Sequence, residues 1–487
     1  MSGDGELADL LAEIVGSTHV LRDASRLLVY RSDALPGYQK RPLLAVLPGS
    51  RDELLRVVRA LAAAGVPFVP RGAGTGLSGG ALADGVVLIG LNRLTRILDV
   101  DVDNRTATVE PGVVNAALSR AVAPHGLHYA PDPSSQSACT IGGNVAENAG
   151  GPHCLKYGVT MNHVLAATVI LADGDIVTLG NADGEPEGYD LLGAFVGSEG
   201  CFGIALEVMV KLTPNPARVI TQLADFTSVD GAARAVSAII AAGILPAALE
   251  LMDQATIGAV ESSIYAAGYP VDAAAVLLVE VDGADAGLDD DARAVQAICL
   301  ANGARGVRTA TDAGERARLW QGRKKAFGAM GRVASHLMVQ DAVVPRTRLA
   351  ELLADIAAIG SRHGVVVCNV FHAGDGNLHP NIPYDGANED ECTRVRLATR
   401  EIMMRCIAAG GTITGEHGVG LDKLGYMESL FTAPTLDAMC RLRDGFDPAR
   451  RANPGKVVPV HSCREWAAAP AWRARAPAVG ATPDSVP

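Results

Sequence analysis

The sequence predicts an α+β protein with two main domains, and the distribution of glycine and proline is the main reason. Three glycine-dense segments lie among short predicted strands in the first half of the chain. After Pro214 and Pro216 the pattern changes to alternating strands and helices, which suits an antiparallel sheet covered by helices on one face. The predicted segments are an N-terminal helical segment at 1–40, a first domain at 41–217, a second domain at 218–459 and a disordered, Ala- and Pro-rich tail at 460–487.

The first domain is predicted to contain a helix followed by two strands. Residues 52–64 carry a helical apolar stripe that ends at Gly65, and 66–70 and 86–91 read as strands. A hairpin is predicted further on, from strands 164–171 and 176–179, and a strand at 205–212 closes the domain.

The first glycine-dense segment, residues 71–80, reads Arg-Gly-Ala-Gly-Thr-Gly-Leu-Ser-Gly-Gly. Its glycines formally match the Rossmann fingerprint, but that fingerprint opens a helix, whereas this segment runs into a predicted strand. What remains is a loop between strands, whose bare backbone N–H groups can surround a pyrophosphate. Thr75 and Ser78 add hydroxyl groups. A plain turn would need only two or three glycines, and this loop has five between Gly72 and Gly80.

Two further segments favour a flat ligand lying against the backbone. Residues 131–151 begin with two prolines that stiffen the chain and continue with small residues and glycines. Residues 197–204 form the third glycine cluster, directly before the strand at 205–212.

The second domain is predicted to alternate strands and helices. Strands are expected at 219–226, 247–252, 275–281 and 365–371, and helices at 229–242, 287–302, 347–363 and 391–409.

Two histidines in the second domain predict half of a metal site. A two-residue type I′ turn at Asp375-Gly376 would pair His372 with His379 across a hairpin, with Cβ atoms about 5 Å apart. Glu416, in a loop flanked by glycines, offers a third ligand beside His417. Two histidines and one carboxylate leave coordination positions open, as catalytic sites require. The alternative is that these histidines are capping or core residues.

Composition excludes several classes of protein. The 487 residues have a formal net charge of −12, which disfavours nucleic-acid binding. Nine cysteines without any Cys-x-x-Cys pair exclude the usual iron–sulfur and zinc-ribbon spacings and indicate reduced thiols. The acidic N-terminus does not resemble a secretory signal, and the longest apolar run, 235–249, is short and interrupted. We therefore expect a cytoplasmic protein with at most peripheral membrane contact.

Taken together, the motifs resemble the FAD-linked 2-hydroxy-acid dehydrogenases of the vanillyl-alcohol-oxidase fold, also called the PCMH-type FAD fold. The resemblance covers about residues 40–459. Besides the glycine segments it rests on 372–379 (His-Ala-Gly-Asp-Gly-Asn-Leu-His), 415–418 (Gly-Glu-His-Gly) and 453–456 (Asn-Pro-Gly-Lys). Within the family, residues 319–327 are most similar to the FAD-containing D subunits of bacterial glycolate oxidases, with D-lactate and D-2-hydroxyglutarate dehydrogenases as near relatives.

The resemblance implies a set of site residues. It places a divalent metal (Zn, Mn or Fe) on His372, His379 and Glu416, the catalytic base at His417, and the groups that bind the substrate carboxylate at Arg323 and Asn381. The FAD contacts that it implies are Arg71, Gly72, Ala73, Gly74, Thr75, Gly76, Ser78, Gly79, Pro131, Asp132, Ser137, Thr140, Gly142, Gly143, Asn144, Gly150, Glu199, Gly203, Ile204 and Asn453.

The resemblance also implies how the enzyme works. Residues 71–80 contain no histidine that could tether the flavin, so non-covalent FAD is expected. The expected reaction is oxidation of a small 2-hydroxy acid, glycolate or D-lactate, to the keto acid. The alternative within the family is a dehydrogenase of D-2-hydroxyglutarate or of another D-2-hydroxy acid, although Phe327 and Val339 look too apolar for 2-hydroxyglutarate. Electrons are expected to pass to a separate acceptor, such as an iron–sulfur partner subunit. Three rivals remain open: a metallohydrolase, a non-redox flavin transferase on the same fold, and a non-catalytic assembly subunit.

Overall fold

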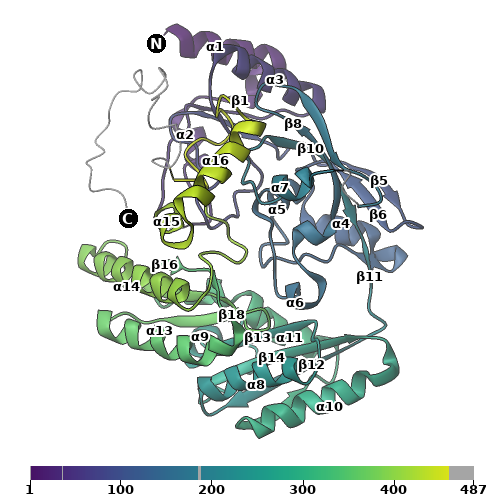
Figure 1. Cartoon of the computed structure of the whole chain (residues 1–487), viewed down its shortest axis with the longest axis vertical. Coiled ribbons are helices and arrows are strands. Elements are labelled where there is room, and N and C mark those ends of the chain that lie inside the picture. The colour runs from purple at the N-terminus through teal and green to yellow at the C-terminus, as the bar shows by residue number, and fades with distance from the viewer. Residues whose placement is uncertain (1, 36, 185–187, 460–487) are drawn as a thin grey trace.

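The protein is an α+β structure of two lobes, here described from a computed structural model (Figure 1). The structure describes residues 2–35, 37–184 and 188–459, so the predicted tail at 460–487 lies outside the described residues. Within these ranges, no helix combines the length and the apolar character needed to cross a membrane.

The first sheet carries the glycine loop 71–80. Its strands, in the order β1-β2-β4-β3, are β1 (Val20–Leu21), β2 (Leu44–Val46), β4 (Val87–Gly90) and β3 (Phe68–Arg71). The loop connects the parallel strands β3 and β4 and opens no helix, as predicted. Helix α3 (Arg51–Ala64) packs its buried Leu54, Val57 and Leu61 in the core beside this sheet, and α1 (Ser2–Val15) lies against α3.

The second sheet is antiparallel and contains the predicted hairpin. Its order is β5 (Ile97–Asp101), β6 (Thr106–Val109), β10 (Ile204–Lys211), β8 (Val164–Ile170) and β9 (Ile176–Gly180). The pairing of β8 with β9 confirms the hairpin. The remaining elements of this lobe are α2 (Ala24–Leu27), α4 (Asn115–Val122), β7 (Leu127–His128), α5 (Ile141–Glu147), α6 (Cys154–Tyr157), α7 (Leu191–Phe195) and β11 (Thr213–Pro214).

The second lobe is built on a large antiparallel sheet. Its main path is β15 (Ala304–Thr309), β12 (Arg218–Phe226), β14 (Ala275–Gly283), β13 (Ala248–Asp253), β18 (Cys368–His372), β19 (Asn377–Leu378) and β17 (Ala342–Val343). Off this path, β20 (Pro380–Tyr384) pairs with β18 and with β16 (His336–Val339). An antiparallel sheet was predicted, and the structure confirms it.

Helices cover both faces of this sheet, so the prediction of one covered face is wrong. Along β13, Leu249 and Leu251 belong to one core, whereas Ala248 and Met252 belong to another on the opposite face. Both faces of the strand are apolar, and the sequence pattern was read as if only one were buried. The first core is covered by α8 (Val229–Ala241), α10 (Asp285–Ala301), α13 (Leu349–His363) and α14 (Glu389–Ala408), and the second by α9 (Gln254–Glu261), α11 (Ala313–Lys324) and α12 (Ala326–Met330).

The end of the described chain returns to the first lobe. Helices α15 (Met427–Leu430) and α16 (Ala433–Phe446) run back beside the N-terminal sheets (Figure 1). Phe446 stacks on Phe202 with ring centroids 4.5 Å apart, and Ala452 forms a β-bridge with Phe68. The chain therefore crosses between the lobes a second time, just after the Glu416–His417 loop.

Candidate active site

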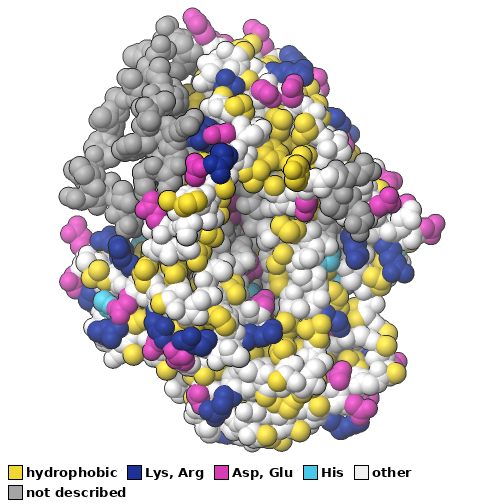
Figure 2. Space-filling view, viewed as in Figure 1, with side chains coloured by type: hydrophobic (Ala, Val, Ile, Leu, Met, Phe, Trp, Pro, Cys, Tyr) yellow, Lys and Arg dark blue, Asp and Glu magenta, His cyan; other side chains and the backbone are white. Residues whose placement is uncertain are grey.

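A single cavity of about 470 Å³ joins the glycine segments of the first lobe to the histidines of the second. The face shown in Figure 2 is hollowed between the two lobes. One end of the cavity is lined by residues of 71–77, 139–150 and 198–205, and the other by Arg323, Lys324, Phe327, His372, His379, Glu416 and His417. The predicted flavin segments and the predicted metal site thus open into the same space.

Two glycines of the loop 71–80 are packed so closely that a side chain at either position would clash with its neighbours. A Cβ atom on Gly72 would lie 2.5 Å from the Thr140 hydroxyl oxygen, and Gly74 has a φ of +71° beside the Arg71 guanidinium. Of the predicted FAD contacts in this loop, Arg71 to Gly76 line the cavity, whereas Ser78 and Gly79 do not. The Ser78 carbonyl oxygen instead accepts the N–H groups of Leu421 (2.8 Å) and Asp422 (3.1 Å). Ser78 therefore ties this loop to the segment after His417.

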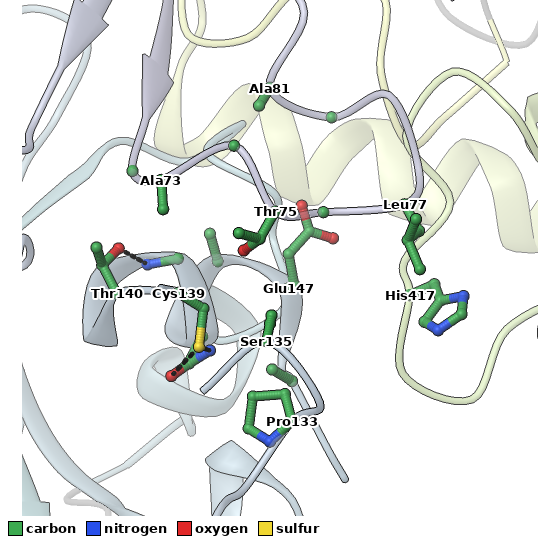
Figure 3. Close-up of a pocket in the computed structure, with 18 of the residues that line it drawn as sticks. Ala73, Thr75, Leu77, Ala81, Pro133, Ser135, Cys139, Thr140, Glu147 and His417 are labelled. Atoms are coloured by element: carbon green, nitrogen blue, oxygen red, sulfur yellow. Dashed lines mark hydrogen bonds between the residues drawn. The ribbon is translucent and has the colours of Figure 1, made fainter. Parts of the chain in front are cut away.

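The second glycine segment forms the start of helix α5. The Thr140 hydroxyl oxygen caps the helix by accepting the N–H of Gly143 at 3.3 Å (Figure 3). A Cβ on Gly142 would meet Pro111 at 2.6 Å, so only glycine allows this close approach. Among the predicted FAD contacts, the cavity is also lined by Thr140, Gly142, Gly143, Asn144 and Gly150 and, from the third segment, by Glu199, Gly203 and Ile204.

Several residues predicted to contact the cofactor lie behind the cavity wall and support it. The carbonyl oxygen of Pro131 accepts a hydrogen bond from Asn115 at 2.9 Å. The Asn453 amide donates to the carbonyl oxygens of Gly80 (2.9 Å) and Glu199 (2.5 Å), so it joins two lining segments. The predicted contacts that do not line the cavity are Ser78, Gly79, Pro131, Asp132, Ser137 and Asn453.

The predicted register of the histidine hairpin is wrong by two residues. His372 pairs with Asn377 and Cys368 with Asn381, so four residues, 373–376, form the turn. Gly376 has a φ of +81°, and a Cβ there would lie 2.2 Å from the Val344 carbonyl oxygen. The N–H of Val344, directly after strand β17, also donates to the Gly376 carbonyl oxygen at 3.0 Å, so the neighbouring segment constrains the turn.

The two histidines meet in spite of the changed register. A slip of two residues keeps both side chains on the same face, because side chains alternate with a period of two. The ring centroids of His372 and His379 are 5.1 Å apart. Glu416 Oε1 lies 3.1 Å from His372 Nε2 and 3.4 Å from His379 Nε2. The sequence therefore identified three side chains that converge in the structure.

These three side chains fit a divalent cation. Their ligand atoms lie within 4.8 Å of one another. The buried His379 forms no hydrogen bond within the described residues, and its Nε2 faces two carboxylate oxygens, Asp341 Oδ1 at 3.5 Å and Glu416 Oε1 at 3.4 Å. A buried imidazole that faces carboxylates in this way fits a site for a divalent cation. His372 Nδ1 donates to Glu250 Oε1 at 2.7 Å, which points Nε2 toward Glu416.

His417 lies beside the three candidate ligands. Its ring stacks on that of His379 with centroids 4.8 Å apart and an interplanar angle of 19°. Burial lowers the pKa of His417 to about 4, so the imidazole is neutral near pH 7 and able to accept a proton. Figure 3 shows His417 next to Leu77 of the glycine loop, at the junction of the two ends of the cavity.

The loop that carries Glu416 and His417 is held by one carboxylate from each lobe. Asp341 Oδ2, in the second lobe, accepts the N–H groups of Gly415 (2.9 Å), Glu416 (3.3 Å) and His417 (3.0 Å). Glu199, in the first lobe, accepts those of Val419 (2.7 Å) and Gly420 (2.8 Å). Burial raises the pKa of Glu199 to about 7. The loop is therefore positioned jointly by both lobes.

The two residues expected to bind the substrate carboxylate lie in different surroundings. Arg323 lines the cavity, with Nε 2.5 Å from Glu250 Oε2, and its Nη1 has no hydrogen-bond partner among the described residues. Asn381 does not line the cavity. Its amide donates to the carbonyl oxygens of His379 (2.7 Å) and Cys368 (3.2 Å). This geometry favours a positioning role for Asn381 beneath His379 and not a substrate contact.

Sequence comparison decides the family. Residues 215–457 match the model for the C-terminal domain of FAD linked oxidases, and residues 42–180 match that for an FAD binding domain. The chain is 45% identical to glycolate oxidase subunit GlcD of Escherichia coli, over 96% of this chain and 95% of that protein. It belongs to the FAD-linked oxidase family. It is also 32% identical to a D-lactate dehydrogenase of Anaerostipes hadrus, over 88% of this chain and 92% of that one.

Solved structures confirm the fold. p-Cresol methylhydroxylase with substrate bound superposes with a TM-score of 0.79 at 16% identity, covering 95% of this chain and 98% of that one. 4-Ethylphenol oxidase from Gulosibacter chungangensis gives 0.77 at 19%, with the same coverage. These are neighbours of the PCMH type that the motifs predicted. In this FAD-linked oxidoreductase, the glycine-rich segments and the histidine cluster line one cavity.

Sequence reasoning missed the residues that support the site. Glu250 orients His372, Asp341 holds the Glu416–His417 loop, and Glu199 holds residues 419–420. Of these three carboxylates, only Glu199 was predicted, as a cofactor contact. Asp341 lies just after strand β16, and no motif in the sequence marked it. Lys324 lines the cavity beside Arg323 and was also missed.

Proposed function

We propose that this chain oxidises a small 2-hydroxy acid, glycolate or D-lactate, to the corresponding 2-keto acid. The observation that carries the proposal is the continuity of one cavity from the glycine segments to His372, His379, Glu416 and His417. A flavin held by the glycine segments would share this cavity with His417. FAD held non-covalently supplies the hydride acceptor of the reaction.

We propose that His372, His379 and Glu416 hold a divalent metal, Zn, Mn or Fe. Bound there, the ion would lower the pKa of the substrate hydroxyl group. His417 is neutral, buried and stacked on His379, so it is placed to take the hydroxyl proton. Asp341 fixes the backbone on which Glu416 and His417 stand, so ligand and base keep one relative position.

The walls of the cavity support a small substrate. Phe327, Leu337 and Val339 line it near the histidines and present no polar group to a second carboxylate. A charged tail there would lose its hydration without a partner, which is costly. We infer that glycolate and D-lactate fit and that D-2-hydroxyglutarate fits poorly.

The electrons must leave the reduced flavin through another group. The sequence has no Cys-x-x-Cys pair with which to hold an iron–sulfur cluster. We propose that a separate acceptor, an iron–sulfur subunit, takes the electrons, since the relative from Escherichia coli is by name a subunit of glycolate oxidase. We place the protein in the cytoplasm, with membrane contact only through such a partner.

The test is anaerobic mixing of the FAD-loaded protein with glycolate, each lactate enantiomer and D-2-hydroxyglutarate, following the flavin absorbance. We expect rapid bleaching by glycolate or D-lactate and much slower bleaching by D-2-hydroxyglutarate. A flavin that stays oxidised with every acid would favour the non-redox transferase. A pure protein that binds no flavin would favour the metallohydrolase.

A further inference from the structure

Two adjacent cations at the end of helix α11, Arg323 and Lys324, line the cavity at its histidine end. The side chain of Arg323 is buried against Glu250, with nitrogen-to-oxygen distances of 2.5 Å from both Nε and Nη2. That edge of the guanidinium is occupied, and its charge is already compensated. Arg323 can therefore offer an incoming carboxylate only the hydrogen bonds of Nη1 and not an uncompensated charge.

Lys324 belongs to a network that spans both lobes. Its Nζ lies 3.1 Å from Asp132 Oδ2, and its ammonium lies 5.7 Å from the centre of the Trp320 ring. Asp132 also accepts from His153 Nδ1 at 2.9 Å. His153 Nε2 reaches Glu280 at 3.3 Å. Asp132 and His153 belong to the first lobe, whereas Lys324, Trp320 and Glu280 belong to the second.

The network contains more positive than negative charge. Arg316 compensates the charge of Glu280 through two bonds of 2.8 Å, in addition to the longer contact of His153, and Trp320 Nε1 donates to the same carboxylate at 2.7 Å. Burial lowers the pKa of His153, but Asp132 and Glu280 together raise it to about 10, so the imidazole is protonated near pH 7. Three cations, His153, Arg316 and Lys324, thus face two carboxylates, Asp132 and Glu280.

The surplus charge is on the side chain that the substrate can reach. Arg316 and His153 do not line the cavity, and Lys324 does. Because His153 already compensates Asp132, the Lys324 ammonium can turn part of its donors toward a ligand without leaving a buried carboxylate unpaired. Lysine is suited to this, because its three donors rotate on a flexible stem.

We propose that Lys324 supplies the uncompensated cation that recognises the substrate carboxylate, and that Asp132 and His153 position it from across the lobe interface. This inference rests on the proposed oxidation of a 2-hydroxy acid and names the residue that selects for the acid. The ligand class is a monoanionic carboxylate bearing a 2-hydroxyl group. Lys324 is then a binding residue, and Asp132 and His153 are positioning residues.

The experiment compares a charged substrate with its neutral isostere in Lys324→Met and Lys324→Arg. Anaerobic stopped-flow reduction of the bound flavin gives an apparent Kd and a limiting rate for glycolate and, separately, for glycolamide. Lys324→Met should raise the apparent Kd of glycolate by about 10- to 100-fold, the usual effect of losing one charged contact. The apparent Kd of glycolamide should change by less than about threefold, and Lys324→Arg should retain part of the glycolate affinity.

Lys325→Met is the matched control, because Lys325 is the next residue, is exposed and does not line the cavity. It should leave both substrates unaffected. An equal loss for glycolate and glycolamide in Lys324→Met, or no loss for either, would overturn the inference and leave Lys324 as a link between the lobes. Equilibrium titration with acetate, followed by the flavin spectrum, gives the same comparison without turnover. If the flavin of the unaltered protein is not reduced by any 2-hydroxy acid, the proposed function fails, whereas the acetate titration still tests Lys324.

Discussion

The two ends of the cavity are built in different ways. At the flavin end, backbone atoms form the wall, and the sequence shows this directly as glycines at 72, 74, 76, 142 and 143. At the histidine end, side chains from distant segments converge, and each is held by a partner far away in sequence. His372 is oriented by Glu250, 122 residues away, and the N–H of His417 by Asp341, 76 residues away. The first kind of site can therefore be recognised from the amino-acid composition, whereas the second kind can be recognised only from the three-dimensional structure.

Removing a metal ligand is expected to have the largest effect. His372→Ala, His379→Ala and Glu416→Ala should each lose the divalent ion and slow flavin reduction by about 10³-fold or more, since Lewis-acid polarisation contributes several kcal/mol. FAD content should not change, because the glycine segments are intact. Elemental analysis and flavin absorbance on the same samples check both statements. Full activity after exhaustive chelation would mean that the histidines are structural.

His417→Asn is expected to slow flavin reduction by on the order of 10²-fold or more, the usual contribution of a positioned general base. Metal and FAD should both remain, since His417 is not one of the three proposed ligands. Single-turnover kinetics should place the loss in the chemical step. If His417→Asn removes the metal and Glu416→Ala keeps it, the roles of these neighbours are reversed.

Asp341→Asn tests whether the support of the histidine end matters as much as its ligands. The substitution weakens the acceptor for three N–H groups and breaks the ion pair with Lys423. Metal affinity should fall by about 10- to 100-fold, the typical effect of losing a group that orients ligands. Competition with a chelator measures it. Asp355→Asn, which removes only a surface pair with Arg405, should leave the affinity unchanged.

Gly72→Ala tests the flavin end with a smaller expected effect. The added Cβ would lie 2.5 Å from the Thr140 hydroxyl oxygen, and overpacking of this kind costs about 1–3 kcal/mol. FAD affinity should fall by roughly tenfold or more, while metal content stays the same. Gly425→Ala is the control, because nothing lies within 4 Å of a Cβ there. Equal FAD affinity in both variants would show that this loop does not contact the cofactor.

The sequence predicted several of the longer helices and strands, because their apolar periods and caps are local. Helix α3, for example, begins after the capping Ser50 and ends at Gly65 with a φ of +65°. The histidine register was wrong, because the contact between Gly376 and Val344 that sets the turn comes from another strand. Glu250 and Asp341 could not be assigned at all, since a carboxylate in a strand gives no local sign of its distant partners.

We propose that the glycine-rich end and the histidine end of the cavity act together on one substrate. The most direct measurement is anaerobic, single-turnover reduction of the bound FAD by glycolate or D-lactate in protein stripped of metal, and in the same protein after a divalent ion is restored. We predict that the stripped protein keeps its flavin but bleaches at least about 100-fold more slowly, and that restoring the ion recovers the rate. Equal bleaching rates with and without the ion, at verified metal content, would contradict the account.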